Sequence, residues 1–496
     1  MALNTFVKSL QNIMRKDSGV DGDAQRLYQI AWMLFLKVYD AREEEWEYEE
    51  DDFVSILPEE CRWRNWAHDK KDGKSMTGEE LLTFVNQTLF PTIKSLEILP
   101  STPRKKALVK SALSDMTNYM KDGVLLRQMV NEIDAVDFND YAESHAFNDI
   151  YEALLKSLQS AGNAGEFYTP RAVTDFVVDR VSPKLGESVA DFACGTGGFL
   201  VSALKILDAQ KHDVQTSELF QNAVFGSEWK PLPHLLSVTN LLLHGVDAPN
   251  IRYGDSLERD VREYEDDERF DVVVMNPPYG GATASATVQK FPADMRTSET
   301  ASLFMVLILY RLKEAGRVGI VLSDGFLFAN SGAERAIKEK LLTECNLHTV
   351  IRLPESVFAP YTSIATNLLF FDKTGKTEET WFYRLDMPEG YKHFSKTKPM
   401  KFEHFAPVLS WWDDRVEIED AREDEDAPVT YKAKKYSFAE LEAGGFSLDY
   451  CGFPKATETV LPPDELLADY YKKKALSEER ISKILAEFEA VLRKSE

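Results

Sequence analysis

The fold is constrained most by a regular alternation of short apolar runs and helical stretches between residues 146 and 385. Apolar runs of about four to eight residues between turn residues are typical of strands buried on both faces. Strands that alternate with helices form a mainly parallel sheet covered by helices. We therefore predict an α/β fold with a doubly wound, seven-stranded sheet. Its strands are residues 188–192, 223–227, 251–253, 270–275, 318–322, 349–353 and 365–371, and helices are expected over 199–207, 235–244 and 302–313.

The segment before residue 146 shows only helical periodicity. Leu27, Ile30, Leu34 and Val38 recur at helical spacing, and most residues between them are also apolar, so this helix should be buried or covered by a partner. The stretch Arg62-Trp63-Arg64-Asn65-Trp66 could contact phosphates and bases, although a solvated helix face is the alternative. We predict a helical domain over residues 1–145 that contacts partners or DNA.

The pattern weakens after Lys373. Residues 413–426 are strongly acidic and are expected to form a solvated loop. From Ser477 onward, apolar residues form one helical stripe that should pack on its own domain or on another subunit. After residues 1–145 we therefore expect an α/β domain over 146–455 and a helical tail for subunit contacts over 456–496.

Composition limits the partners and the compartment. The chain has 82 acidic and 58 basic residues, a net charge of -24, so any hold on nucleic acid must be local or supplied by another protein. Its four cysteines lack metal-ligand spacing, which indicates no metal site and a reducing cytoplasm. The longest apolar run, residues 303–310, is far too short to span a membrane.

A strand over residues 270–275 stops at Asn276-Pro277-Pro278-Tyr279. The prolines hold the backbone extended, so the Asn276 carboxamide and the Pro277 carbonyl form two fixed acceptors beyond the strand end. Ligands of open α/β sheets bind at this edge. Two acceptors beside the Tyr279 ring suit the NH2 group of a planar base. A turn that merely closes a buried strand is the alternative.

A glycine loop, Ala193-Cys194-Gly195-Thr196-Gly197-Gly198, joins another strand to a helix. Its glycines allow a ligand to approach the backbone, and the helix offers unpaired amides. The loop is neither the dinucleotide fingerprint nor a Walker loop. Glu228 and Asp255 follow the next two strands, where they could accept from ribose hydroxyls and an adenine amino group. Either acid alone would more often be a surface or capping residue.

These motifs together resemble S-adenosyl-L-methionine-dependent amino-methyltransferases that act on adenine N6. They are Asp191-Phe-Ala-Cys-Gly-Thr-Gly-Gly-Phe199, Glu228, Gly254-Asp255 and Asn276-Pro-Pro-Tyr279, preceded by Gly165-Glu-Phe-Tyr-Thr-Pro-Arg171. Their order is similar to the gamma arrangement of DNA adenine methyltransferases. A departure is Phe192, where the family often has proline.

The resemblance extends to the modification subunit of type I restriction-modification systems. It is carried by Trp32-Met-Leu-Phe-Leu-Lys37 in the helical N-terminus and by Leu322-Ser-Asp-Gly-Phe-Leu-Phe328. The resemblance implies a Rossmann-like methyltransferase domain, double-stranded DNA as substrate, a specificity subunit, a restriction subunit in the full complex, and two copies of this chain.

The resemblance also implies residue roles. Asn276, Pro277, Pro278 and Tyr279 are the catalytic set, which receives a base flipped out of the duplex. Glu228 takes the ribose and Asp255 the adenine of the cofactor. Thr169 offers a hydroxyl. The residues implied for the rest of the cofactor are Glu166, Phe167, Tyr168, Thr169, Pro170, Arg171, Asp191, Gly195, Thr196, Gly197 and Gly198.

Other functions remain open from the sequence. A protein-glutamine methyltransferase would also use Asn-Pro-Pro-Tyr, because a side-chain amide poses the same chemical problem. A non-catalytic, cofactor-binding assembly subunit is a further alternative. Methylation of cytosine C5 is excluded, since none of the cysteines follows a proline as a nucleophilic thiol would. The loop over residues 280–300, with Lys290 and Arg296, could close over DNA or be a disordered crossover.

Overall fold

The structure is a computed structural model that describes residues 3–68, 75–136, 168–359, 364–395, 397–421 and 428–455, with scattered positions between 467 and 482. It divides into one unit of Met1–Leu385 with Phe394–Pro454 and a small second unit of Asp386–His393 with Lys455–Glu496. Most of the predicted end helix lies outside the described residues, although the scattered positions are helical. No helix in the described ranges is both long and apolar enough to cross a bilayer.

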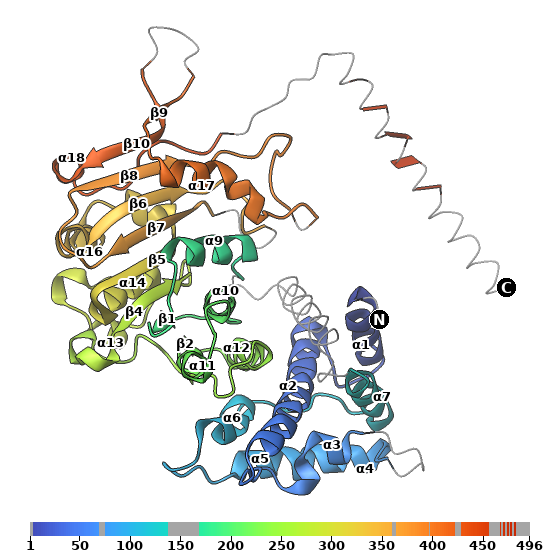
Figure 1. Cartoon of the computed structure of the whole chain (residues 1–496). Coiled ribbons are helices and arrows are strands. Elements are labelled where there is room, and N and C mark those ends of the chain that lie inside the picture. The colour runs from blue at the N-terminus through green and yellow to red at the C-terminus, as the bar shows by residue number, and fades with distance from the viewer. Residues whose placement is uncertain are drawn as a thin grey trace. The chain divides into compact units, whose positions relative to one another are not determined.

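A ten-stranded sheet forms the centre of the first unit, in the order β3-β2-β1-β4-β5-β7-β6-β8-β10-β9 (Figure 1). All seven predicted strands are present, and the α/β class is confirmed. The strands from β3 to β5 are parallel neighbours, and β7 runs antiparallel between β5 and β6. The strands are β1 (Val189–Asp191), β2 (Val224–Glu228), β3 (Ile251–Tyr253), β4 (Phe270–Met275), β5 (Leu312–Ser323), β6 (Asn346–Arg352), β7 (Thr366–Asp372), β8 (Glu379–Arg384), β9 (Ile418–Glu419) and β10 (Tyr431–Ser437).

Helices connect these strands. The three predicted helices are α10, α12 and α14, but α14 ends at Arg311 rather than at Lys313. The reason is that Leu312 already pairs with Phe270 of β4 and begins β5. The helices of this region are α9 (Arg171–Val181), α10 (Gly198–Asp208), α11 (Val214–Gln221), α12 (Pro231–Leu243), α13 (Ser285–Val288), α14 (Thr300–Arg311), α15 (Asp324–Phe328), α16 (Gly332–Glu344), α17 (Ala406–Asp413) and α18 (Phe438–Ala443).

Strands β8, β9 and β10 were not predicted, so the expectation of only an acidic stretch and an end helix after the seventh strand is wrong. Strand β10 has the sequence Tyr-Lys-Ala-Lys-Lys-Tyr-Ser, in which only Ala433 is buried, so no apolar run marks it. Aromatic packing of Tyr436 on Tyr450 and a hydrogen bond of 2.6 Å from the buried Arg384 to the partly buried Asp420 stabilise this side of the sheet instead. Such contacts join distant residues and leave no local sequence pattern.

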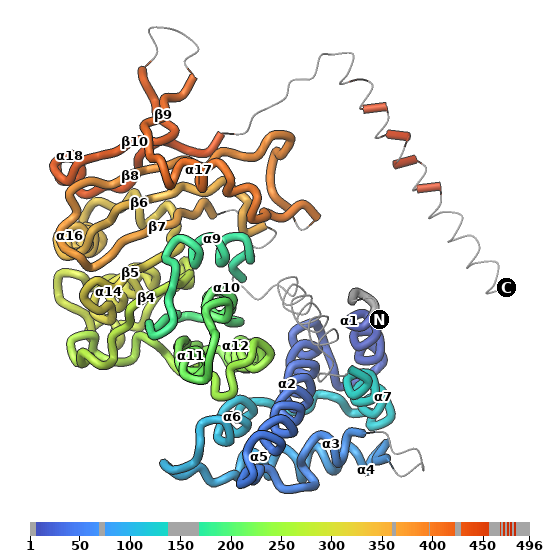
Figure 2. The backbone as a smooth tube through the Cα atoms, viewed as in Figure 1, coloured from blue at the N-terminus to red at the C-terminus, as the bar shows by residue number. Residues whose placement is uncertain are grey.

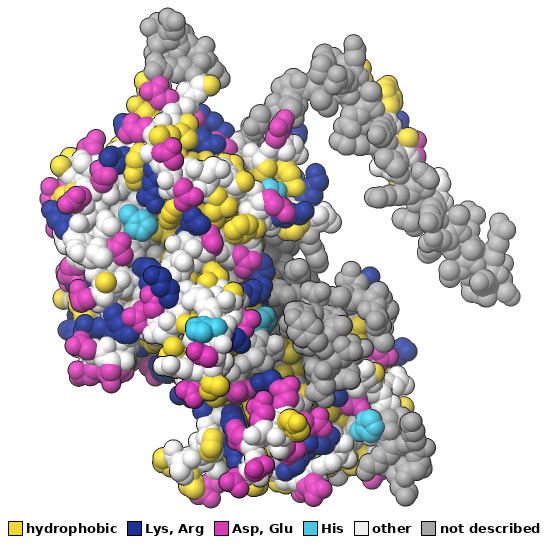
Figure 3. Space-filling view, viewed as in Figure 1, with side chains coloured by type: hydrophobic (Ala, Val, Ile, Leu, Met, Phe, Trp, Pro, Cys, Tyr) yellow, Lys and Arg dark blue, Asp and Glu magenta, His cyan; other side chains and the backbone are white. Residues whose placement is uncertain are grey.

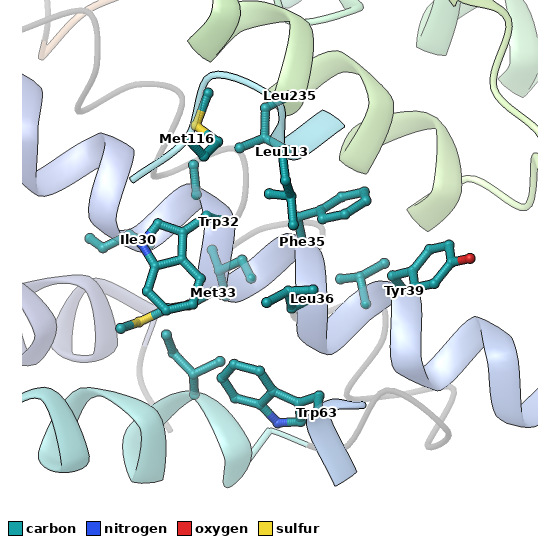
Figure 4. Packing of buried hydrophobic residues seen from close by; sticks show 14 of the residues in the cluster. Ile30, Trp32, Met33, Phe35, Leu36, Tyr39, Trp63, Leu113, Met116 and Leu235 are labelled. Atoms are coloured by element: carbon teal, nitrogen blue, oxygen red, sulfur yellow. The ribbon is translucent and has the colours of Figure 1, made fainter. Parts of the chain in front are cut away.

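The N-terminal part is helical, as predicted, and α2 is its central element. Figure 4 shows Trp32 and Leu36 of α2 among buried side chains that include Trp63 and Leu235. Leu235 belongs to α12, so α2 is buried partly by the α/β region, where the N-terminal helices approach α12 (Figure 2). The helices are α1 (Leu3–Met14), α2 (Gly22–Glu49), α3 (Trp63–Trp66), α4 (Gly78–Thr83), α5 (Phe90–Ser95), α6 (Arg104–Leu113) and α7 (Gly123–Asp134).

The stretch that interleaves arginines with tryptophans is part of this helical core. Trp63 and Trp66 are buried, and the Trp63 indole donates to Asp134 at 2.8 Å. Arg64 pairs with Asp40 at 3.0 Å, and Arg62 pairs with Glu47. Because the rings are covered and the cations are paired with acids of the same domain, a nucleic-acid contact by this stretch is not supported.

Candidate active site

The carboxyl ends of β1, β2, β3 and β4 meet at one edge of the sheet because these four strands are parallel. Strand order reverses beside β1, which is where open α/β sheets bind ligands. The sequence placed Asp191, Glu228, Asp255 and Asn276 after these strands, and the structure brings all four to this edge.

The glycine loop after β1 has the backbone needed for close approach by a ligand. Gly195 and Gly197 have φ values of 54° and 81°, in the left-handed region that side chains disfavour. A Cβ atom added to Gly195 would meet nothing within 4 Å, so the space beside it is open. Helix α10 begins at Gly198, so its first backbone amides have no carbonyl partner within the helix and can bind a ligand at the loop.

Side chains from several elements hold this loop in place. Two of them, Asn240 and Ser256, were not predicted from the sequence; Asn240 is a buried amide in helix α12, which also buries the polar side chains of His234, Ser237 and Thr239. The hydrogen bonds are Gly195 N to Glu228 Oε2 at 2.9 Å, Asn240 Nδ2 to Thr196 O at 2.9 Å, Arg171 Nη1 to Gly198 O at 2.8 Å and Ser256 Oγ to Phe192 O at 2.7 Å. The loop is therefore preorganised by the fold.

Asp191 is a buried carboxyl group that suits a cationic ligand. It is 1% exposed, and its Oδ1 accepts from the amide of Ala193 at 3.0 Å. Burial raises the pKa of Asp191 well above its ordinary value, and the nearby Glu228 acts in the same direction. A ligand ammonium group would compensate the cost of ionising this carboxyl. The residue could therefore hold an ammonium group of a ligand.

Glu228 and Asp255 are partly buried at the ends of β2 and β3. Glu228 Oε1 also accepts from the amide of Lys230 at 2.7 Å, and Asp255 Oδ1 accepts from that of Leu257 at 2.9 Å. Directly after Glu228, Trp229 is 65% exposed. An indole so exposed beside an acidic ligand position offers an apolar face to a planar ring. In the sequence, Trp229 could have been recognised from its position directly after Glu228 at the end of a strand.

Asn276 lies at the end of β4 with both ends of its carboxamide engaged. Its Nδ2 donates to the hydroxyl oxygen of Thr169 at 3.0 Å, and its Oδ1 accepts from the Tyr279 hydroxyl. The Tyr279 ring is 8% exposed, and burial raises the pKa of Tyr279 well above its ordinary value, so the hydroxyl keeps its proton. Pro277 is buried and Pro278 is partly buried.

Of the residues that precede α9 and are implied for the cofactor, the structure describes only some. Tyr168, Thr169 and Pro170 are partly buried and lead directly into α9, whereas Glu166 and Phe167 lie outside the described residues. The contact between Thr169 and Asn276 joins residues 107 positions apart. It links a residue implied for the cofactor to one implied for the target, which the sequence alone did not reveal.

The loop over residues 280–300 is folded rather than a disordered crossover. Its ends are bridged by a hydrogen bond from Thr283 N to Ser298 O at 2.9 Å, and Phe291 is fully buried. Lys290 donates to the carbonyl of Glu258, and Arg296 donates to that of Phe291 at 3.0 Å. The two cations that could have met DNA are therefore bound within this part of the protein.

Comparison with known proteins assigns the family. The family described as N-6 DNA Methylase matches residues 142–459, and the HsdM N-terminal domain matches residues 3–133. The chain is 48% identical over 478 residues to the EcoEI methylase subunit of a type I restriction enzyme from Escherichia coli, covering 96% of this chain and 95% of the relative. It is 28% identical over 404 residues to the EcoKI methylase subunit from strain K12, covering 76% and 70%.

Solved structures agree with this assignment. A modification subunit from Vibrio vulnificus YJ016 is 39% identical, with a TM-score of 0.77 over 94% of this chain and 98% of that one. A chain from a structural study of assembly and conformational transition in the type I R-M system is 34% identical, again with a TM-score of 0.77, over 100% and 99%. This chain therefore belongs to the N-6 DNA methyltransferases that form the methylase subunits of type I restriction enzymes.

Proposed function

We propose that this chain transfers a methyl group from S-adenosyl-L-methionine to the N6 amino group of adenine in DNA. The observation that carries the proposal is the position of Asn276, beside Pro277 at the end of β4 and on the same sheet edge as the glycine loop. An amide oxygen and a backbone carbonyl form the acceptor pair that an exocyclic NH2 group requires. The assigned family supports this chemistry.

The cofactor fits the donors and the open space of the site. Asp191 is proposed to receive its ammonium group, Glu228 its ribose hydroxyls and Asp255 its adenine amino group, with Trp229 against the adenine face. Its remaining part would meet the open side of Gly195 together with Thr196, Gly197, Gly198, Glu166, Phe167, Tyr168, Thr169, Pro170 and Arg171. When bound, the cofactor would supply an electrophilic methyl carbon. Transfer to N6 would break the bond from this carbon to sulfur, sulfur would keep both electrons, and the amine would lose a proton to water.

The protein's contribution is to orient the amine. The N6 lone pair is delocalised into the adenine ring, and two hydrogen bonds from the NH2 group to Asn276 Oδ1 and Pro277 O localise it towards the methyl carbon. N6 cannot be reached inside a duplex, so the base is flipped out and stacks on Tyr279. The Tyr279 hydroxyl already bonds to Asn276 Oδ1, and the second lone pair of that oxygen is proposed to receive the amine.

Mass spectrometry of DNA tests the proposal directly. DNA from cells that express the chain with its genomic neighbours should contain N6-methyladenine at one bipartite sequence. If labelled methyl groups instead appeared on a protein glutamine, the alternative as a protein methyltransferase would replace this proposal. Transfer to neither substrate by the assembled complex would favour a non-catalytic assembly subunit.

Replacing Glu228 with alanine is expected to weaken cofactor binding by about 1–3 kcal/mol, the cost of leaving hydrogen-bonding groups unpaired. Two effects combine, because Glu228 is proposed to bind the ribose and also accepts from the Gly195 amide. Isothermal calorimetry measures the change, with Glu218→Ala on the exposed face of α11 as the control. Equal affinities for both variants would remove Glu228 from the cofactor site.

We further propose that a separate specificity subunit selects the DNA site. The net charge of -24 repels a duplex, and on the face drawn in Figure 3 basic side chains are interspersed with acidic ones. A specific interface with DNA is normally large and positively charged. The complex would contain two copies of this chain. In the full assembly, which is proposed to be cytoplasmic, a restriction subunit would also be present.

Sequence-specific methylation is therefore expected only with that partner. Gel-shift and methylation assays on the purified chain, with and without the specificity subunit, measure the difference. Removing residues 477–496 should weaken assembly but should leave cofactor binding unchanged. The reason is that the helical tail proposed over 456–496 serves subunit contacts. The domain proposed over 1–145 serves such contacts too. The domain proposed over 146–455 should keep the cofactor. Specific methylation by the chain alone would refute the need for a partner.

A further inference from the structure

The hydroxyl group of Thr169 is placed to control the polarity of the catalytic amide. Thr169 precedes α9 and accepts from Asn276 Nδ2 at 3.0 Å, while the Tyr279 hydroxyl donates to Asn276 Oδ1. The Asn276 carboxamide thus lies between the hydroxyl groups of Thr169 and Tyr279. Tyr279 bonds to the oxygen that is proposed to accept from the target amine, and Thr169 bonds to the nitrogen at the opposite end of the amide.

Two hydroxyl groups alone do not determine which way an amide points. A hydroxyl can donate or accept, whereas the amide NH2 only donates and the amide oxygen only accepts. Reversing the carboxamide together with both hydroxyl hydrogens would satisfy the same contacts. In that reversed state the NH2 group of Asn276 would face the incoming amine of adenine, and two donors would oppose one another. Catalysis therefore requires that Thr169 be fixed as the acceptor or that Tyr279 be fixed as the donor.

We propose that Thr169 is a positioning residue that fixes the orientation of Asn276 when the cofactor binds. The inference rests on the proposed function, in which Thr169 is among the residues that would meet the part of the cofactor that includes its carboxylate. A hydroxyl group has a single hydrogen. Once Thr169 donates that hydrogen to the cofactor's carboxylate, its oxygen can only accept, and Asn276 must present Nδ2 to it. Oδ1 then points towards the place of the target amine.

This arrangement couples the two substrates through one amide. Cofactor binding removes the unproductive orientation of Asn276, so a flipped adenine should be held more tightly after the cofactor is bound. Thermodynamic linkage makes the effect reciprocal: a held adenine should strengthen cofactor binding by the same factor. The Tyr279 hydroxyl uses one lone pair of Oδ1 and leaves the other for the amine.

The test compares Thr169→Val and Thr169→Ala, which lack the hydroxyl, with Thr169→Ser, which retains it. The complete complex is mixed with DNA carrying 2-aminopurine at the target position, whose fluorescence reports flipping. S-adenosylhomocysteine, which has the carboxylate but no methyl group to transfer, serves as the ligand. For the native chain and Thr169→Ser, the ligand should strengthen binding of the flipped base roughly 5-fold or more, a typical coupling. For the valine and alanine variants this factor should fall to about one.

A second measurement does not depend on DNA. In the chain labelled with 15N-asparagine, the side-chain NH2 signal of Asn276 is the one missing from Asn276→Asp. Saturating S-adenosylhomocysteine should sharpen this signal in the native chain and in Thr169→Ser but not in Thr169→Val. Calorimetry on each variant sets the ligand concentration needed for saturation, so weaker binding alone cannot mimic the result.

The outcomes separate this inference from the proposed function. If the native complex makes N6-methyladenine and Thr169→Val keeps both the coupling and the NH2 response, Thr169 does not position Asn276. If the native complex makes no N6-methyladenine, the proposed function fails, while the amide signal still reports whether Thr169 orients Asn276. Loss of coupling in Thr169→Ser as well would also overturn the role of the hydroxyl.

Discussion

Replacing Asn276 with alanine should abolish methyl transfer by the assembled complex while leaving cofactor affinity unchanged. The lost oxygen is proposed to act on the target amine, not on the cofactor, so the transition state alone is destabilised. Removing one preorganised polar group of this kind typically slows a reaction about 100- to 1,000-fold. Without the Asn276 oxygen, the target amine would also be oriented less well against the Pro277 carbonyl, which would slow transfer further. Single-turnover transfer of a labelled methyl group measures the rate, and calorimetry measures cofactor binding.

The matched control for this experiment is Asn222→Ala. Asn222 is an exposed asparagine of the same α/β region that follows α11, outside the proposed site. Its replacement should leave both measurements unchanged. A rate for Asn276→Ala within about tenfold of the native rate would exclude the role given to this amide.

Stability of the N-terminal helical part should fall as pH rises from about 4.5 to about 7, because of one buried carboxyl group. Glu43 on α2 is fully buried and accepts from the Ser55 hydroxyl at 2.6 Å. Burial raises the pKa of Glu43 from 4.5 to about 7. Below pH 4.5 the carboxyl is protonated in both states and the shift costs nothing. Above 4.5 the unfolded chain ionises first, so unfolding is increasingly favoured until the folded carboxyl also ionises near pH 7.

The size of this effect follows from the shift in pKa. A difference from 4.5 to about 7 corresponds to about 3 kcal/mol of stability lost above pH 7. The variant Glu43→Gln should remove this loss and unfold at a higher temperature than the native chain at pH 8, but not at pH 4.5. Thermal unfolding followed by tryptophan fluorescence measures this, since Trp46 and Trp63 are buried in the same part. The exposed Glu49→Gln serves as control, and identical pH profiles for both variants would contradict the assignment.

The sequence determined the features whose physical causes are local. The strand before Asn276 could be predicted because buried parallel strands are continuous apolar runs, and its end could be predicted because two prolines cannot continue a ladder. The glycine loop was recognisable because only glycine readily adopts the backbone at Gly195 and Gly197. The order of strands then placed Asp191 and Glu228 at one sheet edge. These inferences needed only residue types and spacing.

Contacts between distant residues were decided by the tertiary structure alone. Nothing local in the sequence distinguishes Trp63 in a core from an exposed tryptophan beside arginines, because burial depends on which helices pack around it. Strand β10 could not be predicted because only Ala433 of its seven residues is buried, so it has no apolar run; its pairing with β8 and β9 is decided by the fold. The hydrogen bond from Asn276 to Thr169 spans 107 positions. It exists only because β4 and the start of α9 meet at one edge, and that meeting results from the packing of the whole sheet.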